Sequence, residues 1–278
     1  MHTVTAPPLF PLLTSSPFSY FISTAYDWSG DEVFLEKAHD LGKRLFKAVD
    51  SNPLGIPYGQ VNLATGAVHN IPWTGDNSIT AEFGTIQIEF RMLARLTGNK
   101  QFKEKSENVF KILKDMNPPH GLYPYFVRNT GSRPEFSNDK LTFGAMGDSF
   151  YEYMLKVWLQ GGKTEPMYRE MYDHSIQGMH DELLQVSSPS GLVFIADKNG
   201  GRLDTKMDHL VCFMGKSMDP RNAICHMTDM TLQYPLIHQT ILLPLSLQRR
   251  LVGSRGLHRS AGAQLGTGSA RFENWKGA

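Results

Sequence analysis

Apolar residues recur at the three- and four-residue spacing of a helix in several stretches, and turn-rich segments separate these stretches. Residues 33–49 keep this spacing behind the motif Ser-Gly-Asp-Glu at residues 29–32, which matches a capping box. A second helix is predicted over residues 79–96, opened by Asp-Asn-Ser at residues 76–78. The segment between them, residues 54–66, is rich in Gly and Pro and predicts at most a short hairpin.

This pattern returns with a period of roughly 65–70 residues. Residues 29–38 align with residues 97–106, and each copy runs into a helix, a Gly-apolar turn, a Thr-Gly pair and an acid-led helix. The leading acids are Glu82 and Asp148, and a fainter third unit places Asp208 equivalently. The long turn-rich connections favour a closed αα barrel, in which the acids converge, over an open solenoid. Alternatively, all three acids are simple helix N-caps.

The second of these acids stands in the most distinctive stretch of the chain. Residues 144–147 are small and Gly-rich, and they lead into Asp148 at the start of a predicted helix. The positive end of a helix dipole keeps a carboxylate ionised at such a position. Phe150, Tyr151 and Tyr153 beside it resemble the stacking floor of a sugar site. A capping aspartate with an aromatic core behind it is the other interpretation.

The two ends of the chain lack the repeat. Residues 1–24 are interrupted by prolines and carry no Lys or Arg, so they make a poor signal peptide and are too short and broken for a membrane span. Residues 216–278 lose the helical pattern, and their last part is expected to be disordered. The sequence therefore predicts an irregular segment over residues 1–24, a helical domain over residues 25–215 and a largely disordered tail.

Composition and charge limit the classes of partner that the chain is expected to bind. The 28 basic and 27 acidic residues give a net charge of +1, which argues against nucleic acid as the main partner. The 16 Phe, 10 Tyr and 4 Trp fit a globular enzyme or a carbohydrate binder. Cys212 and Cys225 match no zinc pattern. They either pair in an oxidising compartment or stay inert core thiols.

Several long motifs together resemble one known family, the class I α-1,2-mannosidases of glycoside hydrolase family 47. They lie at residues 29–38, 53–58, 81–90, 120–124, 147–156 and 206–214. The resemblance implies an all-α fold, here a partial (αα)7 barrel of helical hairpins with short β-hairpin or turn inserts. It also implies a glycosidase of the ER and Golgi that removes terminal α-1,2-linked mannose from high-mannose N-glycans by inverting hydrolysis, with Ca²⁺ as cofactor.

The family's residue roles carry over to matching positions. Asp148 resembles the acid that acts in proton transfer, and the substrate contacts implied are Glu82, Asp208, His209, Phe150 and Glu152. Cys212 resembles half of the family disulfide. Met146 stands where some members have Arg, which is more similar to the Golgi enzymes and implies a different branch preference.

The chain also departs from the family pattern. A Phe-Glu-x-x-Ile-Arg motif with a proton donor, a later catalytic Glu and the Thr that binds calcium have no match, so no metal ligand is recognisable. The chain resembles the middle of the family's catalytic domain, and we expect it to be truncated and inactive. The alternatives are a lectin-like module that binds mannose glycans without turnover and a helical-repeat scaffold.

Overall fold

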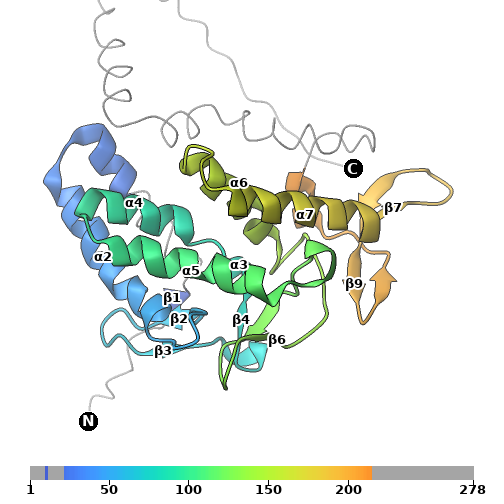
Figure 1. Cartoon of the computed structure of the whole chain (residues 1–278), viewed down its shortest axis with the longest axis horizontal. Helices are drawn as coiled ribbons and strands as arrows, with labels where there is room; N and C mark the ends of the chain where they lie inside the picture. The colour runs from blue at the N-terminus through green and yellow to red at the C-terminus, as the bar shows by residue number, and fades with distance from the viewer. Residues whose placement is uncertain (1–9, 12–21, 215–278) are drawn as a thin grey trace, which may run out of the picture.

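The computed structural model describes residues 10–11 and 22–214 (Figure 1). The whole predicted tail and most of the predicted N-terminal segment lie outside these residues. Residues 22–29 are helical, so the irregular segment ends before residue 24. The long helices that follow are α2 (Glu32–Asp50), α4 (Gln87–Thr97), α5 (Lys100–Met116), α6 (Asp148–Gln160) and α7 (Pro166–Glu182).

These helices form hairpins. Helices α4 and α5 pack along each other, as do α6 and α7, and α2 lies across both members of the first pair (Figure 1). The two hairpins are joined through α4 and α6, which are in contact, and through α5 and α7, where Lys114 pairs with Glu170 at 3.0 Å. The arrangement is that of consecutive hairpins of an αα barrel, and the predicted fold class is confirmed.

Short antiparallel strands and single turns fill the connections. The strands are β1 (Phe10–Pro11), β2 (Gln60–Val61), β3 (Val68–His69), β4 (Asn77–Ile79), β5 (Phe126–Arg128), β6 (Glu135–Phe136), β7 (Leu184–Val186), β8 (Val193–Ile195), β9 (Asp197–Asn199) and β10 (Arg202–Asp204). The 3-10 turns are η1 (Pro72–Thr74), η2 (Pro119–Gly121) and η3 (His209–Met214). The predicted hairpin inserts are thus present.

Two predicted helix starts are wrong. The N-cap of α2 is Asp31, whose Oδ1 accepts a hydrogen bond from the Val33 N–H at 3.0 Å, while Ser29 bonds back to the preceding turn. The helix predicted over residues 79–96 is instead β4, the short helix α3 (Thr80–Phe83) and α4. Ile79 pairs with a residue of β5 far along the chain, and this long-range pairing overrides the local helical pattern.

The described residues form two apolar clusters in the core. One lies between α5, α6 and α7, where the Phe110 ring stacks on Phe150 with centroids 5.4 Å apart and meets Tyr168 edge to face at 5.2 Å. The other lies between α2, α4 and α5, around Phe46 and Phe102. Because α5 contributes to both clusters, the hairpins are fixed relative to one another.

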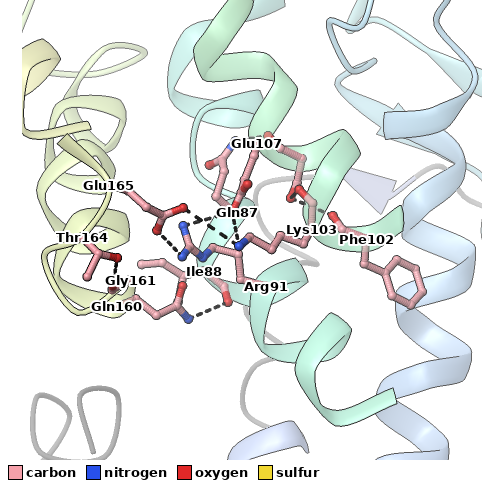
Figure 2. Close-up of polar contacts among 11 residues, drawn as sticks. Gln87, Ile88, Arg91, Phe102, Lys103, Glu107, Gln160, Gly161, Thr164 and Glu165 are labelled. Atoms are coloured by element: carbon pink, nitrogen blue, oxygen red, sulfur yellow. Dashed lines mark hydrogen bonds and ion pairs between the residues drawn. The ribbon is translucent and has the colours of Figure 1, made fainter. Parts of the chain in front are cut away.

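A buried arginine adds a polar link between three elements. Figure 2 shows Arg91 of α4 reaching Glu107 of α5 and Glu165, the N-cap of α7, at 3.0 and 2.6 Å. The Arg91 side chain is only 9% exposed. Lys103 lies 3.7 Å from the same Glu107 oxygen, so the two carboxylates are balanced by two cations.

Candidate active site

Asp148 is the first residue of α6. Gly147 is the N-cap and no side chain caps this helix, so the interpretation of Asp148 as a capping aspartate is wrong. The Asp148 N–H donates to the Gly144 carbonyl at 2.9 Å. Burial raises the pKa of the Asp148 carboxyl, although hydrogen bonds from Ser149 lower it. Desolvation therefore raises the pKa of Asp148 by more than the expected stabilisation of the charged form at the helix N-terminus lowers it.

Asp208 acts on Asp148 through its charge. Its negative charge raises the pKa of Asp148 further. Asp208 Oδ1 accepts a hydrogen bond from the Leu210 N–H at 2.9 Å, which fixes the carboxylate at the start of η3. A Cβ atom on Gly144 would lie 2.5 Å from the Asp208 Cβ, so only glycine fits at this close approach.

Two further predicted residues adjoin this pair. His209 projects its ring to the surface, with Nδ1 3.5 Å from Asp208 Oδ1 and a side chain 90% exposed. Glu152 lies one turn along α6, where its charge also raises the pKa of Asp148. Glu152 forms an ion pair with Lys156 at 2.6 Å. The charges of Glu152 and Asp208 thus both act on Asp148.

Glu82 approaches from α3. The Ala81 N–H donates to the Met146 carbonyl at 2.9 Å, so the segment carrying Glu82 is hydrogen-bonded to the loop that precedes Asp148. Burial raises the pKa of Glu82 to about 7. Its Oε2 is buried and has no hydrogen-bond partner among residues 22–214. A Cβ on Gly59 would lie 2.8 Å from that oxygen. Convergence of Glu82, Asp148 and His209 on one pocket stays a prediction.

Phe150 does not face this site. Its side chain is fully buried and stacks on Phe110, so the ring belongs to the core between α5 and α6. Tyr151 is also buried and stacks on Phe143 at 4.0 Å. The prediction that these rings form a sugar-stacking floor is wrong for Phe150 and Tyr151, because neither exposes a face.

Sequence reasoning missed Asp197. This acid opens β9, shortly after the buried Ile195 and Ala196, and the charge of Asp208 raises the pKa of Asp197. Burial is the larger cause of that rise. An acid placed directly behind the apolar run at residues 193–196 was the signal available in the sequence.

The sequence also led to expectations about a metal ion, a disulfide and a membrane span. Within the described residues no three His, Cys, Asp or Glu side chains converge closely enough to hold a metal ion, so the Ca²⁺ of the family stays an expectation. Cys212 is exposed and unpaired in the described part of the chain, and Cys225 lies outside it, so a disulfide between them stays a prediction. None of the helices described is long and apolar enough to cross a bilayer.

Comparison with known proteins returns one family. The sequence profile of glycosyl hydrolase family 47 matches residues 21–228. A mannosyl-oligosaccharide 1,2-alpha-mannosidase of Arabidopsis thaliana is 46% identical over 193 residues, which are 68% of this chain and 34% of that protein. The human endoplasmic reticulum mannosyl-oligosaccharide 1,2-alpha-mannosidase is 45% identical over 192 residues, 69% of this chain and 27% of that protein.

A solved structure agrees with these matches. The alpha-1,2-mannosidase from Trichoderma reesei superposes with a TM-score of 0.68 at 21% identity, covering 84% of this chain and 52% of that one. The likeness supports the helical-hairpin fold. The chain spans about a third of the length of the curated relatives that it matches.

Proposed function

This chain belongs to glycosyl hydrolase family 47, and we propose that its site at Asp148 binds the terminal α-1,2-linked mannose of high-mannose N-glycans and takes part in its hydrolysis. The observation that carries the proposal is the grouping of Asp148, Asp208 and Glu152. The names of the relatives, mannosyl-oligosaccharide 1,2-alpha-mannosidases, supply the substrate class. The human relative is named as an endoplasmic reticulum enzyme, which supports the secretory pathway as the location of this chain.

Asp148 is the group suited to proton transfer. A carboxyl whose pKa is raised by burial and by two neighbouring carboxylates holds its proton closer to neutral pH than an ordinary aspartate. General acids and bases work best when their pKa lies near the operating pH. Asp148 also lies at a fixed place, because its N–H is bonded to the Gly144 carbonyl.

The remaining acids are suited to holding the sugar. A carboxylate accepts hydrogen bonds from sugar hydroxyls. The Glu82 Oε2 has no partner among the described residues, but it is buried close to Gly59, so it meets a hydroxyl only when the side chain turns outward. Asp208 has its Oδ1 bonded to the Leu210 N–H, which leaves Oδ2 for a hydroxyl. The exposed ring of His209 lies beside Asp208.

Hydrolysis of the mannoside needs more catalytic groups than these acids supply. Inverting hydrolysis requires an acid for the leaving oxygen and a base for the attacking water, on opposite sides of the sugar. Asp148 supplies one of these, and the family motifs for its partner groups are unmatched in the 278 residues. Each acid–base contribution is worth roughly 10²–10⁴-fold in rate. We therefore expect this polypeptide to bind mannose with negligible turnover, which makes a mannose-binding module the second candidate function.

One experiment separates the two functions. The purified chain is passed over immobilised high-mannose glycan, and released mannose is measured over a day with added Ca²⁺. We expect retention that free α-1,2-mannobiose competes away, without release. Mannose release that Asp148→Asn abolishes would establish the hydrolase in this polypeptide. If the chain is not retained and no mannose is released, the proposal is contradicted, and the helical-repeat scaffold is the interpretation that remains.

A further inference from the structure

A buried asparagine links the strand that leads to Glu82 with the backbone that lies against the Glu82 carboxyl. Asn70 follows β3 and is 6% exposed. Its Oδ1 accepts a hydrogen bond from the Gly59 N–H at 3.2 Å. The same oxygen lies 3.2 Å from the hydroxyl of Ser78 in β4, which donates its shorter bond to the Pro57 carbonyl at 2.7 Å. The Asn70 amide thus contacts both the segment before β2 and the strand β4.

The donor side of this amide is also fully used. The Asn70 Nδ2 donates to the Asp76 carbonyl at 3.0 Å and to Asn129 Oδ1 at 2.9 Å. Asn129 is 2% exposed, and its own Nδ2 lies 3.4 Å from the carbonyls of Ile56 and Pro57. A side-chain amide has two donor protons and one acceptor oxygen, so Asn70 is bonded at every polar atom. A fully satisfied buried network of this kind rigidifies the segments that it joins.

Gly59 transmits this rigidity to Glu82. A Cβ added to Gly59 would lie 2.8 Å from Glu82 Oε2 and 3.6 Å from the Ile71 side chain, so the bare backbone at residue 59 lies against the carboxyl. The Oε2 atom is buried and has no hydrogen-bond partner in the described part of the chain. Burying an unpaired carboxyl oxygen costs free energy. Glu82 therefore keeps this place only while the backbone around it stays fixed.

The backbone that carries Glu82 has a second anchor at the loop before Asp148. The Thr80 hydroxyl donates to the Pro124 carbonyl at 2.9 Å, and the Ala81 N–H donates to the Met146 carbonyl, also at 2.9 Å. These bonds fix the start of α3. They leave the Gly59 side of the carboxyl to the Asn70 network.

We propose that Asn70 is a positioning residue, whose amide holds Gly59 and β4 together and so fixes the buried position of the Glu82 carboxyl in the sugar-free chain. The inference rests on the proposed function, in which Glu82 turns outward to accept a sugar hydroxyl, and it names the residue that sets the position from which Glu82 turns. Asn70 acts through Gly59 and β4 rather than on the sugar.

The test is a carboxyl-carbon NMR titration of Glu82 in the full chain without sugar, so it does not depend on mannose binding. Burial raises the pKa of Glu82 to about 7, so this pKa reports how much water reaches the carboxyl. We expect Asn70→Ala to release Gly59, to let water reach Glu82 and to lower the Glu82 pKa by about one unit or more.

Asn62→Ala is the matched control. Asn62 is also 6% exposed, and its Oδ1 accepts hydrogen bonds from the Ala64 and Thr65 N–H groups in the turn between β2 and β3. Both substitutions should lower the free energy of unfolding, because each leaves backbone N–H groups without their acceptor. Only Asn70→Ala should change the Glu82 titration. Asp115→Asn, a change at an exposed site of α5, should change neither quantity.

An unchanged Glu82 titration in folded Asn70→Ala would overturn the proposal, and so would an equal fall of the Glu82 pKa in Asn62→Ala. A second measurement needs no change at Asn70. In the wild-type chain the side-chain amide protons of Asn70 should follow the Glu82 titration, and Glu82→Gln should abolish this response. If these signals stay constant while Glu82 titrates, the proposal is wrong even where Asn70→Ala does not fold. Mannose binding by the same variants is measured separately, so a failure of the proposed function is recognised independently.

Discussion

Glu89 illustrates how strongly burial acts on single carboxyl groups in this chain. It lies on the side of α4 that faces α6, where Oε1 accepts a hydrogen bond from the Tyr153 hydroxyl at 2.7 Å. Its Oε2 is buried and has no hydrogen-bond partner in the part of the chain that is described. Burial raises the pKa of Glu89 to about 7, as it does for Glu82. Both groups therefore change charge near neutral pH.

The stability of the protein should depend on pH through Glu89. Its pKa is higher in the folded chain than the ordinary value of 4.5, so between pH 4.5 and 7 the folded state binds more protons than the unfolded state. The free energy of unfolding therefore falls as pH rises through this window, by roughly 2–3 kcal/mol for Glu89. Urea unfolding at pH 5 and pH 8 measures this difference.

Glu89→Gln should remove that share of the pH dependence, because the amide stays neutral at both pH values and can still accept from Tyr153. Glu104→Gln, at an exposed site of α5, is the matched control and should leave the dependence unchanged. An equal difference between pH 5 and pH 8 in the wild type and Glu89→Gln would show that Glu89 is ionised in the folded chain.

At the scale of the elements, close packing and one ion cluster decide how the hairpins meet. Gly84 ends α3, and a Cβ there would lie 2.4 Å from the Phe150 ring and 2.6 Å from the Thr80 carbonyl oxygen. Helix α3 therefore touches α6 at a glycine. Arg91 joins α4, α5 and α7 through Glu107 and Glu165 (Figure 2).

Gly84→Ala should lower the free energy of unfolding by about 1–3 kcal/mol, because the added methyl overpacks the contact between α3 and α6. Denaturant unfolding followed by circular dichroism measures the change.

Gly98→Ala is unsuitable as a control since Gly98 has a positive φ. Ser149→Ala, at a half-buried position in the first turn of α6, is a gentler comparison and should cost less. No loss in Gly84→Ala would mean that the two elements are not in close contact.

Arg91→Met should cost about 3 kcal/mol or more, because it removes the buried one of the two cations that balance Glu107 and Glu165. Lys114→Met breaks the exposed pair with Glu170 and should change the free energy of unfolding by less than about 1 kcal/mol. Similar losses in the two variants would contradict the account of Arg91 as a buried link.

At the scale of the whole molecule, the repeat predicted the array of hairpins correctly, because apolar spacing within each helix is a local property. The break in the helix predicted over residues 79–96 was not predictable in this way, since it depends on pairing between β4 and β5. The repeat also identified Asp148 and Asp208, which the fold brings together. It could not tell which way Phe150 faces, because α5 packs against that ring.

The central claim is that Asp148 lies at a site for terminal α-1,2-linked mannose, and calorimetric titration with α-1,2-mannobiose tests it most directly. Asp148→Asn should fold normally, because Gly147 rather than Asp148 is the N-cap of α6. We predict binding by the wild type and by the control Asp115→Asn. Asp148→Asn should bind at least about tenfold more weakly, a loss of roughly 1.4 kcal/mol. Equal affinity in Asp148→Asn, or wild-type binding no stronger than that of maltose, would contradict the account.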